Sequence, residues 1–287
     1  MPQVKIVECP RDAMQSIKTF IPTKTKLSYL QSVVDVGFDV VDIGSFVSPK
    51  AIPQLSDTSR IIDSIDLSNS SSELLVIVAN KRGALNASMF EKIDFLGYPF
   101  SISENFQMRN TNKTINDSEK ELAEIISIAE KVNKKIVVYL SMCFGNPYGD
   151  PWNLDIVNHW VYKLSKMGVK IISLSDTIGT SNPESIKSIF YSVLKNHIDI
   201  EFGAHLHSDP STWYNKIHSA FEAGCRRFDG AIKGFGGCPM ASNKLVGNMP
   251  TEKILSYLNT KKISNNVNSL RFESCYNQSL EIFNKFH

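Results

Sequence analysis

The stretch IISLSDTIGTSNPESIKSIFYSVLKNHIDIEFGAHLH, residues 171–207, carries the pattern that decides the fold. A short apolar run, Ile171–Leu174, is followed by a segment with helical spacing of apolar residues, Pro183–Lys195, and then by a second apolar run, Ile200–Ala204. Asn182 before Pro183 is a favourable helix start, because Asn caps the first turn and proline needs no hydrogen-bonded amide there. The stretch therefore predicts a strand–helix–strand unit.

The same alternation extends along almost the whole chain. Further apolar runs predict strands at Lys5–Glu8, Asp39–Ile43, Leu74–Ala79, Lys92–Leu96, Ile136–Ser141 and Arg227–Ala231. Further helical patterns cover Ser118–Val132, Leu154–Met167 and Thr212–Ala223. Gly37, Gly168 and Gly224 each stand where a helix would end and a strand begin.

Eight strands alternating with helices over about 250 residues are the number expected for a closed (β/α)₈ TIM barrel. An open, doubly wound sheet also alternates, but no Gly-x-Gly-x-x-Gly motif follows the first strand, which argues against its dinucleotide-binding form. No Gly/Ser/Pro-rich linker divides the chain. We therefore predict one domain over residues 1–287, with a barrel from about residue 4 to 258 and extra C-terminal helices in an extension over 259–287.

Composition excludes several classes of protein. The balance of 31 basic and 29 acidic residues, with no Lys/Arg-rich tract, argues against nucleic-acid binding. No apolar stretch approaches the roughly 18 residues that a membrane span needs. The N-terminus starts in a strand pattern without the apolar region of a signal peptide. Five cysteines without clustered spacing indicate reduced thiols, so we expect a cytoplasmic location.

Polar residues recur at one position of the pattern, directly after the predicted strands. In a (β/α)₈ barrel the catalytic residues lie at the carboxyl ends of the strands and in the loops that follow. The residues found there, in chain order, are Arg11, Asp12, Gln15, Asp42, Asn80, Ser103, Glu104, Cys143, Asp176, His205, His207 and the loop Gly234–Cys238. Residues scattered at random would not align in this way, so we expect one site at this end of the barrel.

Two histidines close the predicted seventh strand. Because residues i and i+2 on a strand point to the same face, His205 and His207 can bind one ion together. The alternative is a hydrogen-bonded pair at a strand end. Asp12 would add an anionic oxygen and Asn248 a carbonyl oxygen. Two nitrogens, two oxygens and open positions suit an octahedral divalent ion such as Mg²⁺ or Mn²⁺. Zinc is the weaker alternative, because no cysteine stands at zinc-ligand spacing beside the histidines.

Arg11 and Cys238 are the candidates for the chemistry itself. An Arg-Asp dipeptide is more commonly a surface ion pair, but the position of Arg11 after the first strand favours a place near the metal. A fixed guanidinium there would stabilise an oxyanion developing on a carbonyl. A free cysteine is usually a small buried apolar residue. The glycines before Cys238 allow close approach of the backbone, which makes its thiol a candidate proton donor or acceptor.

Three charged residues have two interpretations each. Asp42 either caps a strand end or positions Arg11 or a catalytic water. Asp176 lies in Ser175-Asp176-Thr177-Ile178-Gly179 and either forms a turn, the favoured interpretation, or supports the site. Lys50 lies in a loop after a strand, where it could meet a phosphate of a large substrate, although a solvated surface charge is the commoner case. Arg82, Arg109 and Lys113 also lie in such loops and have the same two interpretations as Lys50.

These residues lie in motifs that resemble the 3-hydroxy-3-methylglutaryl-CoA (HMG-CoA) lyase family of metal-dependent barrels, from about Val4 to Leu258. The most specific matches are Ser45-Phe46-Val47-Ser48-Pro49-Lys50 and Gly236-Gly237-Cys238-Pro239. Further matches, in the same order as in the family, are Pro10–Gln15, Pro53-Gln54, Ser103-Glu104 with Phe106 and Asn110-Thr111-Asn112, Gly145–Tyr148, Asp176–Gly179, His205–His207 and Gly234-Phe235.

The resemblance implies cleavage of a carbon–carbon bond, with acetoacetate and acetyl-CoA as products. Asp12, His205, His207 and Asn248 would hold the divalent metal, which would bind the 3-hydroxyl and the terminal carboxylate of the substrate. The catalytic residues would be Arg11 at the thioester enolate, Cys238 and His205 in proton transfer, and Asp42 as the residue that orients the site. Gln15, Lys50, Asn110 and Asp176 would contact the acyl-CoA substrate. The family often forms dimers, so a homodimer is expected by analogy alone.

The chain also departs from the family pattern. Ala13 replaces a glycine, Asp42 replaces a glutamate, and Ser208 replaces an acidic residue. The spacing between Cys238 and Asn248 is one residue longer than usual, which makes Asn243 an alternative metal ligand. These changes surround the substrate, so two alternatives stay open. One is a lyase or aldolase of the same mechanism acting on another 3-hydroxyacyl-CoA or hydroxy acid; the other is a non-catalytic barrel that binds an acyl-CoA.

Overall fold

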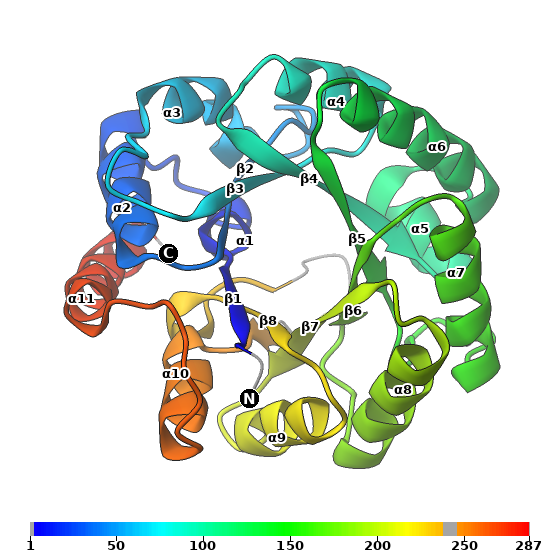
Figure 1. The fold of residues 1–287 in the computed structure, drawn as a ribbon. Coiled ribbons are helices and arrows are strands. Elements are labelled where there is room, and N and C mark those ends of the chain that lie inside the picture. Colours follow the sequence, from blue (N-terminus) through cyan, green and yellow to red (C-terminus); the bar gives the residue numbers. More distant parts are fainter. Residues whose placement is uncertain (1–2, 238–245, 287) are drawn as a thin grey trace.

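Eight parallel strands form a closed ring in the computed structural model, which describes residues 3–237 and 246–286 (Figure 1). The strands of the ring are β1 (Lys5–Glu8), β2 (Val40–Ser45), β3 (Glu73–Ile77), β4 (Ile93–Ser101), β5 (Lys135–Ser141), β6 (Ile171–Asp176), β7 (Glu201–Ser208) and β8 (Arg227–Gly230). Each pairs with its neighbours in chain order, β1 pairs with β8, and β6 pairs with β7. The predicted (β/α)₈ barrel is confirmed.

Helices surround the ring (Figure 1). Those that follow β1 to β4 are α1 (Pro10–Gln15), α2 (Thr23–Val36), α3 (Thr58–Ser64), α4 (Lys81–Ser88), α5 (Glu104–Thr111) and α6 (Ile115–Lys131). Those that follow β5 to β8 are α7 (Leu154–Lys166), α8 (Pro183–Asn196), α9 (Trp213–Glu222), α10 (Thr251–Thr260) and α11 (Ser269–Phe286). Two short 3₁₀ turns, η1 (Pro53–Leu55) and η2 (Ile232–Gly234), lie in loops.

Helix starts and ends follow from local sequence. Asn182 caps α8 by accepting a hydrogen bond from the Ser185 amide at 2.8 Å, and the Ser185 hydroxyl in turn accepts one from the Asn182 amide. Proline occupies the first turn, as the sequence predicts. Helix ends also follow from local sequence. Gly37 ends α2 with φ of 87°, a left-handed conformation in which a side chain would be strained.

Two strands extend further than the apolar pattern predicts. β4 continues to Ser101, although Gly97 and Pro99 read as turn residues, because both pair in register with β5. β7 continues to Ser208, four residues beyond the predicted end at Ala204. His205 and His207 are therefore strand residues. His205 pairs with β6, and His207 pairs with the short antiparallel strand β9 (Gly247–Asn248).

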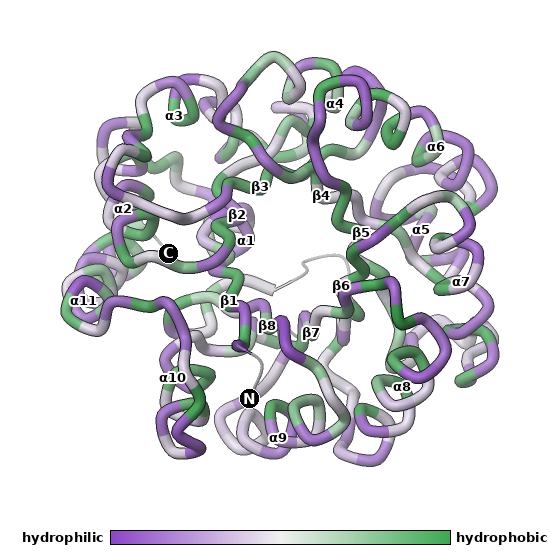
Figure 2. Tube along the Cα trace, viewed as in Figure 1, coloured by the Kyte–Doolittle hydropathy of each residue, from purple (hydrophilic) through white to green (hydrophobic). Residues whose placement is uncertain are grey.

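The interior of the barrel is separate from the layer between strands and helices. Inward positions of six strands form one apolar cluster: Val7, Cys9, Val40, Leu75, Ile77, Phe95, Val137, Tyr139 and Ile171. The intervening strand positions face outward and pack against the helices. Along these helices, hydrophobic and hydrophilic residues alternate (Figure 2). In the part of the chain that the structure describes, no helix is long and apolar enough to cross a membrane.

The predicted C-terminal extension consists of one helix among the described residues. α10 follows β8 and completes the outer ring, whereas α11 lies outside the ring beside α2 (Figure 1). Phe283 of α11 is fully buried and meets the ring of Tyr29 edge-on, with centroids 6.0 Å apart. Leu270, at the start of the same helix, is 80% exposed, so the buried face of α11 begins further along the helix.

Candidate metal and substrate site

A cavity of about 270 Å³ lies at the carboxyl ends of the strands. Its lining contains both polar and apolar side chains. The polar lining comes from Arg11, Asp12, Gln15, Asn110, Thr111, Ser141, Ser175, Thr177, His205 and His207, and the remaining lining from Val47, Ala51, Ile52, Ile77, Ala79, Pro99, Phe106 and Tyr139. Predicted site residues from α1, which follows β1, and from β7 therefore meet at one surface, as the barrel geometry requires.

Asp12, His205 and His207 bring one ligand atom each to within 4.8 Å of one another. Asp12 lies in α1, which begins at Pro10 directly after β1, so the short helix turns its carboxylate toward β7. The two histidines share one face of β7. A hard anionic oxygen and two imidazole nitrogens form a set that divalent cations bind, so the residues fit the metal site that the sequence predicts.

The electrostatics of this cluster also suit a cation. Burial, together with the charge of the neighbouring His205, lowers the pKa of His207 to about 4, so its imidazole is neutral at pH 7. Burial opposes ionisation of Asp12, but Arg11 and His205 outweigh it and lower its pKa. The buried Nδ1 of His207 has no hydrogen-bond partner among the residues that the structure describes. A neutral imidazole beside a carboxylate is the protonation state that metal ligation needs.

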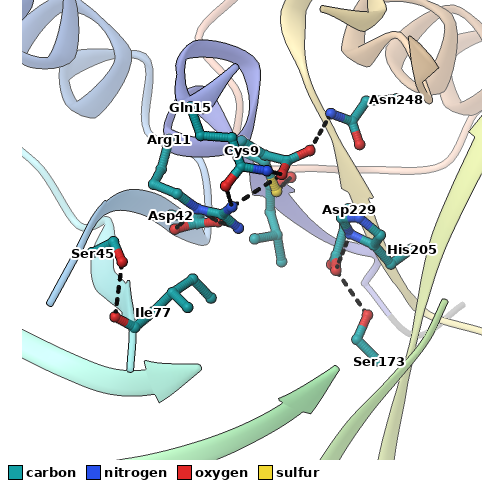
Figure 3. Close-up of polar contacts among 12 residues, drawn as sticks. Cys9, Arg11, Gln15, Asp42, Ser45, Ile77, Ser173, His205, Asp229 and Asn248 are labelled. Atoms are coloured by element: carbon teal, nitrogen blue, oxygen red, sulfur yellow. Dashed lines mark hydrogen bonds and ion pairs between the residues drawn. The ribbon is translucent and has the colours of Figure 1, made fainter. Parts of the chain in front are cut away.

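The imidazole of His205 contacts a carboxylate on the neighbouring strand β8 (Figure 3). Its Nδ1 lies 3.2 Å from Oδ2 of Asp229, and the hydroxyl of Ser173 donates to the same oxygen at 2.7 Å. Burial alone would lower the pKa of His205, but the hydrogen bond to Asp229 and the charges of Asp229 and Asp12 raise it. Since Nδ1 faces Asp229, Nε2 is the nitrogen that can face a cation.

Arg11 is fixed by two carboxylates and an amide (Figure 3). Its Nε and Nη2 donate to Asp42 at 3.0 and 2.6 Å, and its Nη1 donates to Asp12 at 3.0 Å and to Gln15 at 2.8 Å. Gln15 also donates to Asp12 at 2.6 Å. Burial opposes the charge of Arg11, but the two carboxylates outweigh it and raise its pKa. The guanidinium is therefore a permanent, oriented positive charge beside the metal cluster.

Asp42 lies where β2 departs from regular pairing with β3, and its side chain is fully buried. Burial raises its pKa to about 6, while the hydrogen bonds and charge of Arg11 act in the opposite direction. Of the two interpretations from the sequence, the contacts are those of a residue that positions Arg11.

The residues Gln15 and Asn110 both line the cavity, Asn110 from the last turn of α5.

Asn248 reaches the site through β9, which places it opposite His207. Its amide nitrogen donates to Asp12 at 2.5 Å and to the Phe235 carbonyl at 2.9 Å. The residue predicted as a fourth ligand is thus in contact with the cluster, with its nitrogen toward Asp12. Cys238 and Asn243, the other candidates from this loop, lie outside the described residues.

Two predicted substrate residues lie elsewhere. Lys50 is exposed in the turn after β2 and is absent from the cavity lining that the described residues form. Asp176 is buried beside the cavity, where it accepts hydrogen bonds from Lys216 at 2.7 Å and from the Ser181 hydroxyl at 2.5 Å. Lys216 also donates to the carbonyl of His207 at 2.8 Å. Asp176 thus holds the loop after β6 against β7. This structural role resembles the turn that the sequence favours for Asp176.

Sequence reasoning missed Asp229, Ser173 and Tyr139. All three occupy inward positions of predicted strands, and Tyr139 meets the ring of His205 edge-on with centroids 5.4 Å apart. The available signal was Asp229, a carboxylate two residues after Arg227 in the predicted strand Arg227–Ala231. Buried carboxylates require a partner, so this residue pointed to a polar contact within the barrel.

Known proteins with similar sequences carry related names. The family model HMGL-like matches residues 3–277. A hydroxymethylglutaryl-CoA lyase of Bacillus subtilis is 31% identical over 261 residues, which cover 90% of this chain and 85% of that protein. A cytoplasmic 3-hydroxy-3-methylglutaryl-CoA lyase of Homo sapiens is 31% identical over 269 residues, which cover 92% of this chain and 71% of that protein.

Solved structures agree with this similarity. The crystal structure of an HMG-CoA lyase from Bacillus subtilis has a TM-score of 0.92 and 30% identity, and the match covers 99% of this chain and 96% of that chain. An HMG-CoA lyase from Acinetobacter baumannii, solved in complex with coenzyme A and 3-methylmalate, has a TM-score of 0.90 and 27% identity over 98% of this chain and 92% of that chain. On the extent of the family match and on relatives more than 30% identical along most of both chains, this chain belongs to the HMGL-like family of lyases.

Proposed function

We propose that this protein is a metal-dependent lyase that cleaves HMG-CoA to acetoacetate and acetyl-CoA. The observation that carries the proposal is the convergence of Asp12, His205 and His207 within 4.8 Å in the cavity that Arg11 also lines. The names of the relatives support this reaction, and the coenzyme A bound to the Acinetobacter baumannii relative supports an acyl-CoA substrate.

The proposed metal is Mg²⁺ or Mn²⁺, because a carboxylate and two imidazole nitrogens, with no cysteine among the three converging residues Asp12, His205 and His207, suit a hard octahedral cation. Asp12, His205 and His207 would hold it. Asn248 is the proposed fourth ligand through its amide oxygen, and Asn243 is the alternative. The chemistry that such a cation supplies is polarisation of the 3-hydroxyl and terminal carboxylate oxygens of the substrate.

The bond changes balance without a further reactant. The 3-hydroxyl loses its proton, C3 becomes the ketone of acetoacetate, and the electron pair of the C2–C3 bond moves to the thioester as an enolate. Protonation at C2 then gives acetyl-CoA. Arg11, oriented by Asp42, would stabilise the enolate oxygen, since an oriented positive charge in a water-poor cavity acts strongly on developing charge. His205 would take part in moving the hydroxyl proton.

The remaining roles rest on the sequence motifs. We propose Cys238 as the residue that helps to deliver the proton to C2. Gln15 and Asn110 would contact the substrate inside the cavity, Lys50 would meet a phosphate of the CoA moiety, and Asp176 would support the metal site through Lys216.

The decisive experiment measures acetyl-CoA release by the purified protein with Mg²⁺ or Mn²⁺, using HMG-CoA and a panel of other 3-hydroxyacyl-CoA thioesters. Turnover of HMG-CoA above the others is the expected result. Turnover of another thioester alone would overturn the substrate and favour the same mechanism on a different one, for which Ala13 and Asp42 provide the reason. Ligand binding without cleavage of any thioester would identify a non-catalytic barrel.

We propose a cytoplasmic location and a homodimer as further properties. The four cysteines that the structure describes, Cys9, Cys143, Cys225 and Cys275, are free thiols, which is typical of a reducing compartment. The homodimer rests on analogy with the family. Cell fractionation tests the location, and sedimentation analysis of the purified protein tests the oligomeric state. The single-domain organisation over residues 1–287 stays a prediction that limited proteolysis would test.

A further inference from the structure

The polar side of the barrel interior includes residues that the proposed reaction does not use. Alternate residues of a barrel strand face inward, so β7 presents Glu201, Gly203, His205 and His207, and β8 presents Arg227 and Asp229. Opposite these strands the interior is the apolar cluster of β1 to β6. A guanidinium and a carboxylate are thus enclosed directly below the metal cluster.

The carboxylate of Asp229 is aimed at His205. Its side chain is fully buried, and its Oδ2 receives the Ser173 hydroxyl at 2.7 Å while it lies 3.2 Å from Nδ1 of His205 (Figure 3). The Ser173 hydroxyl has a single hydrogen, which it donates to Asp229. The imidazole therefore meets a carboxylate that a second strand, β6, holds in place.

Arg227 balances the charge of this carboxylate within the barrel. Its side chain is 2% exposed, and one of its nitrogens donates to Glu201 at 3.0 Å, while Lys5 forms the outer ion pair of Glu201. Gly203 makes room for the guanidinium stem: a Cβ at residue 203 would lie 3.1 Å from Cδ of Arg227 and 3.0 Å from the Ser173 hydroxyl. A chain of alternating charges thus extends from the amino end of the barrel to Asp229.

We infer that Asp229 is a positioning residue that holds His205 in the tautomer with its proton on Nδ1 and its Nε2 lone pair directed to the metal site. A metal-bound histidine commonly donates its second ring nitrogen to a carboxylate, which fixes the ring and strengthens the ligand. The inference rests on the proposed metal site and adds to it the residue that orients one ligand. Ser173 holds Asp229 in place by its hydrogen bond, and the positive charge of Arg227 acts on the carboxylate without a hydrogen bond between the two.

The test compares Mn²⁺ affinity, measured by calorimetric titration, in the full-length protein and in the variant Asp229→Asn. Asparagine keeps the size of the side chain but removes its charge, so the affinity should fall by roughly 10- to 100-fold. The milder Ser173→Ala should reduce it by about two- to fivefold, the effect of one hydrogen bond. Asp94→Asn is the matched control: this carboxylate accepts the Leu74 amide at 2.8 Å at the start of β4 and lies outside the cavity lining. Its Mn²⁺ affinity should not change.

A second measurement does not depend on whether the variants fold. In the Mg²⁺-bound protein labelled with ¹⁵N-histidine, the His205 signals should be those of the Nδ1–H tautomer. An Nε2–H tautomer, or an Asp229→Asn variant with affinity within twofold of the unsubstituted protein, would overturn the inference and leave the proposed function standing. Absence of Mn²⁺ binding by the unsubstituted protein would overturn both.

Discussion

His207 is the residue on which the proposed metal site depends most directly. It is 2% exposed and almost entirely enclosed, and burial keeps its imidazole neutral at pH 7. One ligand atom each of His205 and Asp12 lies within 4.8 Å of its own, and its buried Nδ1 has no hydrogen-bond partner among the described residues.

We predict that His207→Ala abolishes stoichiometric Mn²⁺ binding and acetyl-CoA release, because the site loses one of the two imidazole nitrogens that converge with Asp12. Calorimetric titration and the release assay measure the two effects. His159→Ala, at an exposed histidine of α7, is the control and should bind one Mn²⁺ as before. A His207→Ala protein that still bound one equivalent would remove this residue from the ligand set.

Cys238 is the second residue whose role can be tested in isolation. Cys238→Ser preserves the size of the side chain but raises the pKa of the proton donor from that of a thiol to that of an alcohol. We predict normal folding and Mn²⁺ affinity with a loss of kcat of about 10²- to 10⁴-fold, the range for general acid–base catalysis. Unchanged turnover would exclude Cys238 from the reaction. Cys225→Ser, at a buried free cysteine that does not line the cavity among the described residues, provides a control for thiol loss.

At the scale of elements, Lys216 joins α9 to two strands. Its ammonium donates to Asp176 at the end of β6 at 2.7 Å, to the Gly179 carbonyl at 2.9 Å and to the His207 carbonyl of β7 at 2.8 Å. All three hydrogens of the ammonium are used, and the pair is buried. The helix therefore fixes the loop after β6 against the strand that carries the histidines.

Lys216→Met should lower the free energy of unfolding by about 3–5 kcal/mol, because it leaves the Asp176 carboxylate buried without its partner. Denaturant titration checks this value. Lys187→Met, at an exposed lysine of α8, is the matched control and should change stability by no more than about 0.5 kcal/mol. Equal stability of both variants would show that the buried ion pair contributes nothing.

Glu8 joins β1 to the segment that follows β8 and to α10. It is fully buried and accepts the Ile232 amide at 2.9 Å and the Thr251 hydroxyl at 2.5 Å. Burial raises its pKa from 4.5 to about 8, although both hydrogen bonds act to lower it. Between these pH values the folded chain keeps a proton that the unfolded chain has lost.

The stability of the protein should therefore decrease as the pH rises from about 5 to 8, with a contribution from Glu8 of about 1.4 kcal/mol per pH unit. Below pH 4.5 both states are protonated, and above pH 8 both are ionised, so the contribution is constant outside this window. Glu8→Gln should remove this component. Denaturant titrations of both proteins at pH 5, 6, 7 and 8 measure it, and parallel curves would show that Glu8 does not titrate in this range.

For the whole molecule, α11 connects the C-terminus to the site. Phe283 packs against Tyr29 of α2 on one side and stacks on Phe235 on the other, with centroids 4.2 Å apart. Phe235 belongs to the glycine-rich loop, and its carbonyl accepts the Asn248 amide. The last helix thus supports the loop that places Asn248.

Phe283→Ala should cost about 3–5 kcal/mol of folding free energy, the usual cost of removing a buried phenylalanine. Since α11 supports Asn248 through Phe235, Mn²⁺ affinity should also fall. Leu270→Ala, on the exposed part of the same helix, should leave both quantities unchanged. Denaturant titration and Mn²⁺ titration distinguish the two variants, and a stable Phe283→Ala protein would exclude α11 as a support of the barrel.

Local patterns were sufficient for much of this architecture. Alternating apolar runs and helical segments predict the eight strands and most helices, because burial of strands and of one helix face imposes a period on the sequence itself. The start of α8 at Pro183 depends on residues within one turn, and the sequence predicts it correctly. The polar residues after successive strands likewise predict that Asp12 and the two histidines meet, since the barrel brings those ends together.

Contacts between strands distant in the sequence were decided only by the tertiary structure. The pairing of β9 with β7 places Asn248 opposite His207, and the closure of β8 against β7 places Asp229 under His205. No local period encodes these pairs, because the register between neighbouring strands of a closed barrel depends on the packing of its whole interior. The sequence by itself determined the barrel and predicted which residues would meet at one end of it; the closed interior alone decided that Asp229 lies against His205.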